Sequence, residues 1–441
     1  MASEWGKIPL GDLVALQRGH DLPSQDRRKG EIPIMGSSGL TGYHDEAKCK
    51  GPGIVIGRSG NSMGVVSYSD SDFWPLNTAL YVTDFKGNDE RYIYYLLSQI
   101  DFDQFNSGSA QKSLNRNAVY PFLVWATKNK DEQKKIGVAL ERYENKIQLN
   151  RQTNQTLEQM AQALFKSWFV DFDPVIDNAL AAGNPIPDAL QARAERRQQQ
   201  LAKPDHKPLP EAIRQHFPCE FEQTEALGWV PKGWESGTLA SIANALSGFA
   251  FKSKDFSEEG EAVIKIKNIK ADRTVDIADV ARVPLAISKA ADRFLLRDGD
   301  IVLAMTGATV GKFGVIVSEG TESYFLNQRV CKLSPKESNR NVFLYSALNK
   351  QGVEESILEA AQGSAQPNIS AKSILSTLMV IPPSELIDQF VSLMEPSFGR
   401  RIGLVKENYK LCKMRDTLLP KLISGELRIP DVEKEVSDAV A

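Results

Sequence analysis

The residues with the spacing closest to a known chemical motif form a glycine loop, Gly307-Ala-Thr-Val-Gly311-Lys312. A phosphate-binding loop has four residues between its glycines and a Ser or Thr after its lysine, whereas here there are three and the next residue is Phe313. The corresponding loop earlier in the chain, Gly60-Asn-Ser-Met-Gly64, has no lysine. Both loops are therefore predicted to be turns between strands, in which glycine permits positive φ.

Other signatures of catalysis are missing from the sequence. There is no dinucleotide-binding GxGxxG after a strand, no GxSxG and no Asn-Pro-Pro-aromatic tetrapeptide of the amino-methyltransferases. The cysteines and histidines have no disulfide-framework or metal-site spacing: Cys49, Cys219, Cys331, Cys412, His20, His44, His206 and His216. We expect no catalytic centre, no metal and no cofactor in this chain.

Two groups of polar side chains have the composition of a DNA-binding surface. Arg and Lys neutralise phosphates, and Asn and Gln can pair with the edge of adenine. Single residues of these kinds are common on any surface, so the prediction rests on their clustering. The first group is Arg18, His20, Arg27, Arg28, Ser37, Ser38, Tyr43, Arg58, Ser59, Asn61, Gln111, Lys112 and Asn115. The second group is Lys252, Lys254, Lys265, Lys267, Asn268, Thr306, Thr309, Lys312, Asn327, Gln328, Arg329, Gln366 and Asn368.

Composition neither requires nor excludes this interpretation. The 441 residues suffice for two or three domains, and 42% hydrophobic residues is ordinary for a globular protein. Because 53 basic residues are offset by 56 acidic ones, a contact with nucleic acid must come from local patches. No signal-peptide core and no apolar run of membrane-spanning length is present, which predicts a cytoplasmic protein.

The elements that must position these side chains occur twice along the chain. Residues 1–130 alternate short β-rich runs with Gly, Ser, Asn and Pro, which favours a mixed α+β domain. Its landmarks return in the same order: the start at Trp5 returns at Trp234, the loop 53–65 returns at 300–312, and Gly-Ser-Ala-Gln at 108–111 returns at 363–366. This order indicates a duplicated unit.

Each copy ends in a long amphipathic segment with a coiled-coil seam. The predicted pairing positions are Leu140, Tyr143, Ile147, Asn150, Asn154, Leu157 and Leu164 in the first helix, and Met394, Leu404, Asn408, Leu411 and Leu418 in the second. Asparagines in a seam lower stability but favour the register in which they pair. Parallel and antiparallel pairing both remain open, and Pro396 leaves open where the second helix begins.

We therefore predict an α+β fold in which two pseudo-two-fold-related domains are joined by two long paired helices. The predicted ranges are 1–130 for the first domain, 131–170 for the central helix, 171–233 for a proline-rich connector with one helical pattern at 188–202, 234–383 for the second domain, 384–426 for the distal helix and 427–441 for a polar tail.

Two segments at the helix ends, LEQMAQALFKSWFVDFDPV at 157–175 and MRDTLLPKLISGEL at 414–427, together with the repeated Gly-Ser-Ala-Gln, carry a family resemblance. The chain resembles the DNA specificity subunit of type I restriction-modification systems. The resemblance implies two target-recognition domains that each bind one half of a split DNA site, and paired helices that act as a ruler. It also implies a non-enzymatic chain that binds double-stranded DNA, two methyltransferase subunits and restriction subunits. S-adenosylmethionine, ATP and Mg would then belong to those partners.

The competing interpretation is a non-enzymatic scaffold, whose duplicated domains assemble a protein complex without reading DNA sequence. A scaffold has no need for Arg18, Arg58, Lys265 and Lys312 to converge on one face, so the placement of these basic side chains discriminates between the two interpretations.

Overall fold

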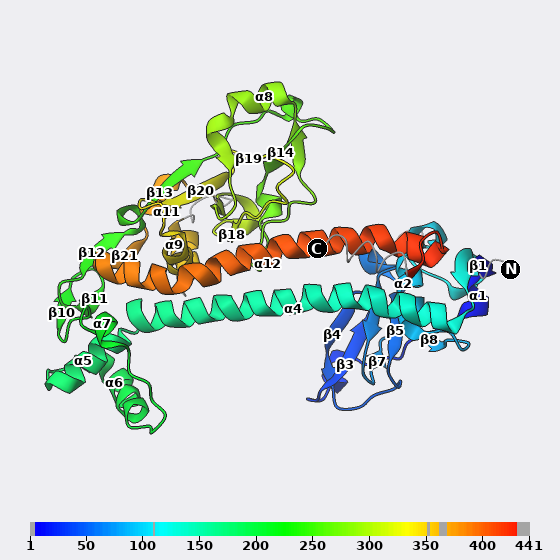
Figure 1. The fold of residues 1–441 in the computed structure, drawn as a ribbon, viewed down its shortest axis with the longest axis horizontal. Coiled ribbons are helices and arrows are strands. Elements are labelled where there is room, and N and C mark those ends of the chain that lie inside the picture. Colours follow the sequence, from blue (N-terminus) through cyan, green and yellow to red (C-terminus); the bar gives the residue numbers. More distant parts are fainter. Residues whose placement is uncertain (1–4, 109–110, 351–352, 361–367, 430–441) are drawn as a thin grey trace. The chain divides into compact units, whose positions relative to one another are not determined.

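The computed structural model describes residues 5–108, 111–350, 353–360 and 368–429 (Figure 1). Its contacts divide the chain into two units, residues 1–148 with 410–441 and residues 149–409. Helices α4 (Lys130–Phe169) and α12 (Ser384–Ser424) contribute a segment to each unit. Each unit therefore contains one sheet domain and part of both helices, which confirms the predicted α+β fold class.

Unit 1 is built on an antiparallel sheet with the strand order β2-β8-β5-β6. A smaller sheet has the order β4-β3-β7, and β1 pairs with β9 directly before α4 begins. The strands are β1 (Trp5–Pro9), β2 (Ala15–Arg18), β3 (Ile32–Gly36), β4 (Gly39–His44), β5 (Gly53–Gly57), β6 (Val66–Ser69), β7 (Trp74–Pro75), β8 (Ala79–Asp84) and β9 (Leu123–Thr127), and the helices are α1 (Leu10–Leu13), α2 (Glu90–Ser98) and α3 (Arg116–Val119).

Unit 2 repeats this plan with the sheet order β13-β20-β17-β18 and a second sheet β15-β14-β19-β16. Its strand β12 pairs with β21 directly before α12. The strands are β12 (Glu235–Thr238), β13 (Ala243–Ser247), β14 (Glu261–Ile264), β15 (Ala281–Val283), β16 (Leu295–Leu296), β17 (Ile301–Ala304), β18 (Phe313–Val315), β19 (Tyr324–Leu326), β20 (Val330–Pro335) and β21 (Leu378–Ile381), and the helices are α8 (Leu285–Ala290), α9 (Asn341–Leu348), α10 (Val353–Ala360) and α11 (Ala371–Leu375).

The connector contains more helix than the sequence pattern predicted. Besides α6 (Asp188–Leu201) it has α5 (Asp173–Ala182), α7 (Glu211–Arg214) and the hairpin β10 (Phe221–Thr224)–β11 (Gly228–Pro231). Proline is compatible with the first turn of a helix, and Pro174 occupies that place in α5. Arg193 joins α6 to α5 by two hydrogen bonds of 2.7 Å to the Asp173 carboxylate.

Pro396 left open where the second long helix begins. Helix α12 runs without interruption from Ser384 to Ser424, so this proline lies inside the helix. A proline inside a helix removes one backbone hydrogen bond and disfavours the preceding turn. The turns before it are nevertheless held by burial: Leu386, Ile387 and Phe390 are at most 2% exposed in the core of unit 2. Tertiary packing thus outweighs the local cost of the proline.

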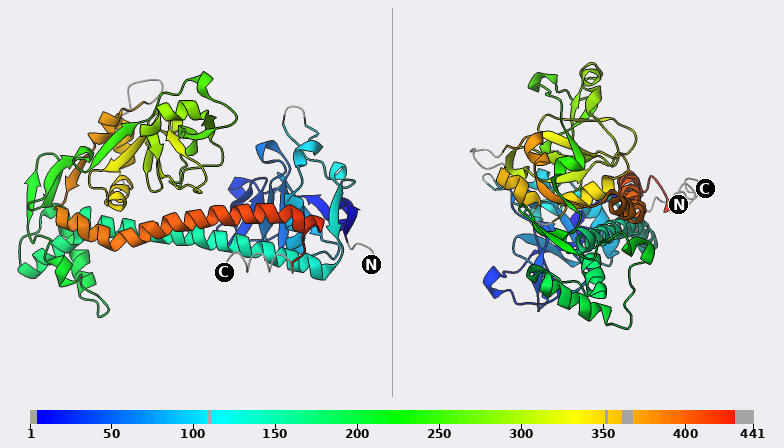
Figure 2. Two further views of the ribbon diagram at one scale, coloured as in Figure 1. Left: turned by 45° about the horizontal axis from the view of Figure 1, so that its top comes forward. Right: turned by 90° about the vertical axis from the view of Figure 1, so that its left-hand side faces the viewer.

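Within unit 2 the two helices run antiparallel, and both views of Figure 2 show them side by side there. The Asn150 side-chain amide donates to Asn408 Oδ1 at 2.9 Å, and Glu158 pairs with Arg401 at 2.9 Å, so positions rise along α4 as they fall along α12. Asn150 is buried. The second seam amide of α4 differs, since Asn154 Oδ1 is buried without a hydrogen-bond partner among the described residues.

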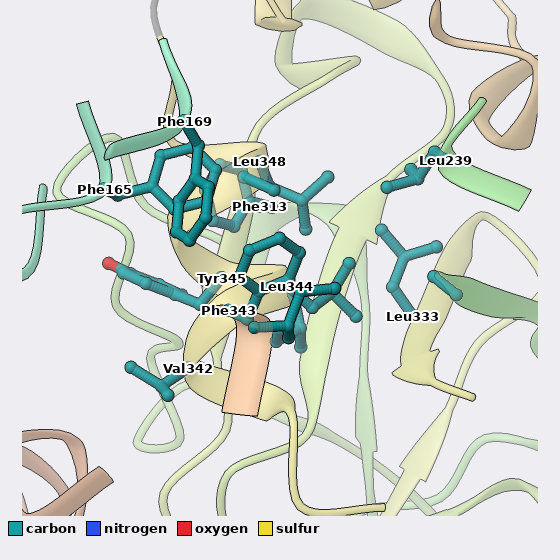
Figure 3. Packing of buried hydrophobic residues seen from close by; sticks show 14 of the residues in the cluster. Phe165, Phe169, Leu239, Phe313, Leu333, Val342, Phe343, Leu344, Tyr345 and Leu348 are labelled. Atoms are coloured by element: carbon teal, nitrogen blue, oxygen red, sulfur yellow. The ribbon is translucent and has the colours of Figure 1, made fainter. Parts of the chain in front are cut away.

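The helices also supply part of each domain core. In unit 2, Phe165 and Phe169 of α4 and Phe390 of α12 pack on Phe343 of α9, with ring centroids 5.4–6.0 Å apart (Figure 3). In unit 1, a single apolar cluster joins Ile136 and Leu140 of α4 and Leu418, Leu419 and Leu422 of α12 to the first sheet domain. Of the predicted seam positions, Leu164 and Met394 pack against the core cluster of unit 2.

The end of α12 is closed by the first strand of unit 1. The Trp5 indole N–H donates to the Ile423 carbonyl at 2.9 Å, and the ring covers Gly425, whose φ is +74°. A side chain at Gly425 would lie 2.6 Å from the indole ring. The corresponding Trp234 packs on Phe169 and Phe172 at the end of α4. Each sheet domain therefore begins with a tryptophan on the end of a long helix.

We predict that Gly425→Ala lowers the free energy of unfolding more than Gly183→Ala. Gly183 has a φ of +72° but no atom within 4 Å of an added Cβ, so its replacement costs only backbone strain, about 1 kcal/mol. At Gly425 the collision with Trp5 adds roughly 1–3 kcal/mol. Chemical denaturation of both variants measures the difference. Equal losses of unfolding free energy would show that the Trp5 ring can move aside without destabilising the fold.

Candidate nucleic-acid interface

Four segments of unit 1 meet at one end of the β2-β8-β5-β6 sheet. The Arg58 N–H donates to the Thr78 carbonyl at 2.9 Å, and the Arg58 carbonyl accepts from the Leu114 N–H at 2.8 Å. Gly60 donates to the Lys112 carbonyl at 3.0 Å, and Arg18 Nε donates to the Asn77 carbonyl at 3.3 Å. These bonds bring together the predicted residues Arg18, His20, Arg58, Ser59, Asn61, Gln111, Lys112 and Asn115.

Unit 2 brings the corresponding four segments together. Met305 donates to the Arg329 carbonyl at 3.0 Å, and Thr306 forms a β-bridge with Asn368. Gln328 donates to the Phe249 carbonyl at 2.9 Å, which places the turn before β20 beside the segment that follows β13. Lys265 directly follows β14, whose Ile264 carbonyl accepts from Asn327 at 3.1 Å, so this lysine joins the group.

The two glycine loops adopt the predicted conformation. Gly60 and Gly307 have φ values of +73° and +77°, and Gly64 and Gly311 have +86° and +82°. A short 3₁₀ turn follows the strand in each case, η2 (Gly60–Ser62) and η8 (Gly307–Thr309). In unit 1 the turn with Ser37 and Ser38 lies beside this loop, since a side chain at Gly57 would be 2.4 Å from the Ser37 carbonyl.

One segment of the interface was missed in the sequence of unit 1. Asn77 and Thr78 directly precede β8 as Gln328 and Arg329 directly precede β20, but only the second pair was predicted. A signal was present one residue away from this register, because the dipeptide Leu76-Asn77 recurs as Leu326-Asn327. Asn77 donates its own backbone N–H to the His20 carbonyl at 2.9 Å, which places it within the group.

The predicted basic side chains differ in how far they are already neutralised. Lys112 pairs with Asp103 at 2.6 Å, Arg28 with Asp45 at 2.7 Å and Lys267 with Asp279 at 2.8 Å. Within the described ranges, Arg58 and Arg329 form no ion pair. Arg18 and Lys312 also form no ion pair there, and we expect these four to retain the strongest attraction for phosphate or for the acceptor edge of guanine.

Several predicted residues have other roles or other places. Asn268 is wrong as a DNA contact, because it is 1% exposed and its amide donates to the Asp276 and Asp279 carbonyls at 2.9 Å. The Lys265 ammonium lies 3.5 Å from the centre of the Phe256 ring, and burial lowers its pKa. Tyr43 belongs to β4 in the smaller sheet of unit 1, and Arg27 and Arg28 lie in the loop before β3. Lys252 and Lys254 lie on or beside the turn η5 (Ser253–Asp255), and Gln366 lies outside the described residues.

The remaining polar predictions lie close to the loops. Lys312 ends the turn between β17 and β18, and its carbonyl accepts from Ala304 at 2.8 Å. The hydroxyls of Thr306 and Thr309 are buried and have no hydrogen-bond partner among the residues the structure describes. The same part of the chain contains no group of three His, Cys, Asp or Glu side chains placed to hold a metal ion, and no helix long and apolar enough to cross a membrane.

Comparison with known proteins adds independent information. The family profile described as "Type I restriction modification DNA specificity domain" matches residues 2–159 and 231–402. The type I restriction enzyme HindI specificity subunit of Haemophilus influenzae is 28% identical over 321 residues, covering 68% of each chain. The MjaIX specificity subunit of Methanocaldococcus jannaschii is 23% identical over 354 residues, covering 77% of this chain and 70% of the relative. The solved S subunit of a type I restriction-modification system from M. genitalium shares the fold, with a TM-score of 0.56 at 18% identity, covering 95% and 96% of the two chains.

We predict that Arg58→Ala weakens DNA binding by roughly 5- to 100-fold, as expected when one arginine contact to a base is lost. Fluorescence anisotropy with duplex DNA over a range of salt concentrations measures the loss and the salt slope. Arg214→Ala, which removes the same charge from an ion pair with Glu211 in the connector, is the control and should bind as the unaltered protein does. Equal binding by both variants would remove Arg58 from the interface.

Proposed function

The chain belongs to the family of type I restriction-modification DNA specificity domains, of which it holds two copies, and we propose that each copy reads one half of a bipartite asymmetric DNA site. It is a specificity subunit with two target-recognition domains, and the scaffold interpretation is not favoured. The observation that carries the proposal is the recurrence of the same four segments at the same end of each main sheet. The backbone frame is shared, while Arg58, Ser59 and Asn61 stand where the second copy has Met305, Thr306 and Ala308. A shared frame with different side chains is what two different half-sites require.

Chemistry on the DNA is assigned to partner subunits. The sequence lacks the amino-methyltransferase tetrapeptide, so we propose that a methyltransferase subunit binds S-adenosylmethionine and methylates adenine. A restriction subunit would likewise supply the ATP- and Mg-dependent steps. The specificity subunit then contributes the choice of site, as expected for a cytoplasmic defence against foreign DNA.

The exposed face of α4 in unit 2 suits a protein partner. Leu149 and Met160 are 55% and 53% exposed, and eleven residues correspond to about three helical turns, so both lie on the same side of the helix. Of the eight exposed residues between positions 149 and 163, only Arg151 is charged. A solvent-facing helix normally carries mixed charges, whereas apolar and amide side chains are typical of helix-on-helix association. We propose that a helix of the methyltransferase subunit packs on this face.

The long helices provide the ruler of the proposal. Forty residues of α4 correspond to about 60 Å of helix, while half-sites one DNA turn apart are separated by roughly 34 Å. A helix of this length is sufficient to carry two domains at such a separation, which supports the proposal that the long helices act as the ruler.

The proposed function predicts a methylome with one bipartite methyladenine motif that depends on this chain. Modification-aware long-read sequencing of host DNA, with and without the gene, measures it. Replacing residues 1–130 by those of a relative should change one half of the motif and leave the other half unchanged. An unchanged methylome in a host that expresses the methyltransferase subunit would instead support the scaffold interpretation.

The proposed docking face makes a separate prediction. Leu149→Lys with Met160→Lys should reduce co-purification of the methyltransferase subunit by at least roughly tenfold, because it places two charges in an apolar contact. Leu285→Lys is the matched control, since Leu285 is 56% exposed on α8. Unimpaired assembly of the double variant would show that the partner binds elsewhere.

A further inference from the structure

A partly buried polar cluster joins the second target-recognition domain to both long helices. Glu158 of α4 accepts from the Tyr345 hydroxyl at 2.7 Å and from the Asn349 amide at 3.0 Å. Its other oxygen accepts from Arg401 of α12 at 2.9 Å, and Arg401 also donates to the Tyr345 hydroxyl at 3.2 Å. Figure 3 shows the Tyr345 hydroxyl pointing away from the apolar side chains that surround its ring.

Unit 1 contains a cluster of the same three residue types. The Tyr95 hydroxyl of α2 donates to Glu144 of α4 at 2.9 Å, and Arg415 of α12 lies 3.8 Å from the other oxygen of that carboxylate. Burial raises the pKa of the Glu144 carboxyl. In both units, therefore, a tyrosine from the domain, a glutamate from α4 and an arginine from α12 form one Tyr–Glu–Arg cluster.

The two clusters are not copies produced by the duplication. The repeat offset of 254 residues that carries Asn154 onto Asn408 carries Glu144 onto Phe398 and Glu158 onto Cys412. Phe398 contacts Tyr345 through its ring instead, with the centroids 5.7 Å apart. The same contact has thus been built from positions that are not equivalent in the repeat, which argues against simple inheritance and for a shared role.

Stability is an unconvincing role for these groups. Burying an ion pair costs desolvation that its attraction often only balances, and well-packed apolar residues commonly do as well. What buried polar groups add is register, because they are satisfied in one alignment and left unpaired in others. A slip of α4 by one turn, about 5.4 Å, would remove each glutamate from its tyrosine and its arginine.

We infer that the two Tyr–Glu–Arg clusters are positioning groups that fix where along the helix pair each target-recognition domain is attached, and so set the single spacer length that the complex accepts. The inference rests on the proposed function. One base pair changes the separation of half-sites by about 3.4 Å, less than one helical turn, so a loosened attachment should admit neighbouring spacers.

The test is Glu158→Met with Arg401→Met in the complete methyltransferase complex, read by modification-aware sequencing of host DNA. Removing both charges together leaves no unpaired ion but removes the partners of the Tyr345 hydroxyl, so thermal unfolding of the subunit should stay within about 5–10 °C of the unaltered protein. Both half-site sequences should persist. The preference for the native spacer over spacers one base pair longer or shorter should fall by roughly ten- to hundredfold, the loss expected for one charged hydrogen bond.

Three further variants complete the test. Glu158→Gln keeps the shape of the side chain and should relax the spacer in the same direction, whereas Glu385→Gln, on the exposed first turn of α12, should not. Ile374→Val removes a methylene from the core of unit 2 and controls for destabilisation alone. A folded Met pair that still methylates one spacer only would overturn the inference, while the absence of any bipartite motif in the unaltered complex would overturn the proposed function itself.

Discussion

The apolar faces of the two long helices must be covered, and most features of this molecule follow from how that is done. Neither helix is covered by the other alone. In each unit the core is one cluster that includes side chains of α4, of α12 and of the sheet domain, and several of the helix residues, such as Leu140 and Phe390, are fully buried. Burial of a side chain of this size stabilises the fold by roughly 1.5–3 kcal/mol. Each sheet domain therefore packs on both long helices. A domain cannot form its complete core without segments from distant parts of the chain.

This arrangement explains why β1 meets the end of α12 within unit 1. Because α12 contributes Leu418, Leu419 and Leu422 to the first core, the end of the second helix has to meet the first strand. Trp5 makes that connection through its hydrogen bond to the Ile423 carbonyl and its contact with Gly425. Trp234 has the same relation to the end of α4. The duplication is thus visible in packing as well as in sequence. The core of unit 1 includes side chains of α12, and the core of unit 2 includes side chains of α4.

Polar residues at equivalent positions of the two long helices do not all make equivalent contacts. The repeat equates Asn154 with Asn408, but their contacts differ. Asn150 and Asn408 pair within unit 2, while Asn154 leaves its oxygen without a partner among the described residues. The Tyr–Glu–Arg clusters use helix positions that the repeat does not equate. The polar contacts of the long helices therefore do not repeat at positions that the duplication equates.

The sequence by itself determined the duplication, the sheet-domain class, the two long helices and the loop glycines, because these depend on local periodicity and on backbone conformations that few residues tolerate. It also predicted most polar segments of the candidate interface, whose contacts with DNA stay a prediction, although it missed Asn77 and Thr78 and included the buried Asn268. Whether an amide faces DNA or the core depends on contacts made after folding, and Asn268 is satisfied by carbonyls eight and eleven residues further along the chain. Only the tertiary structure decided that the helices are antiparallel, that α12 continues through Pro396 and that Glu144 and Glu158 each meet a tyrosine and an arginine. Those features arise from burial and pairing between residues far apart in the chain, for which a local pattern carries no signal.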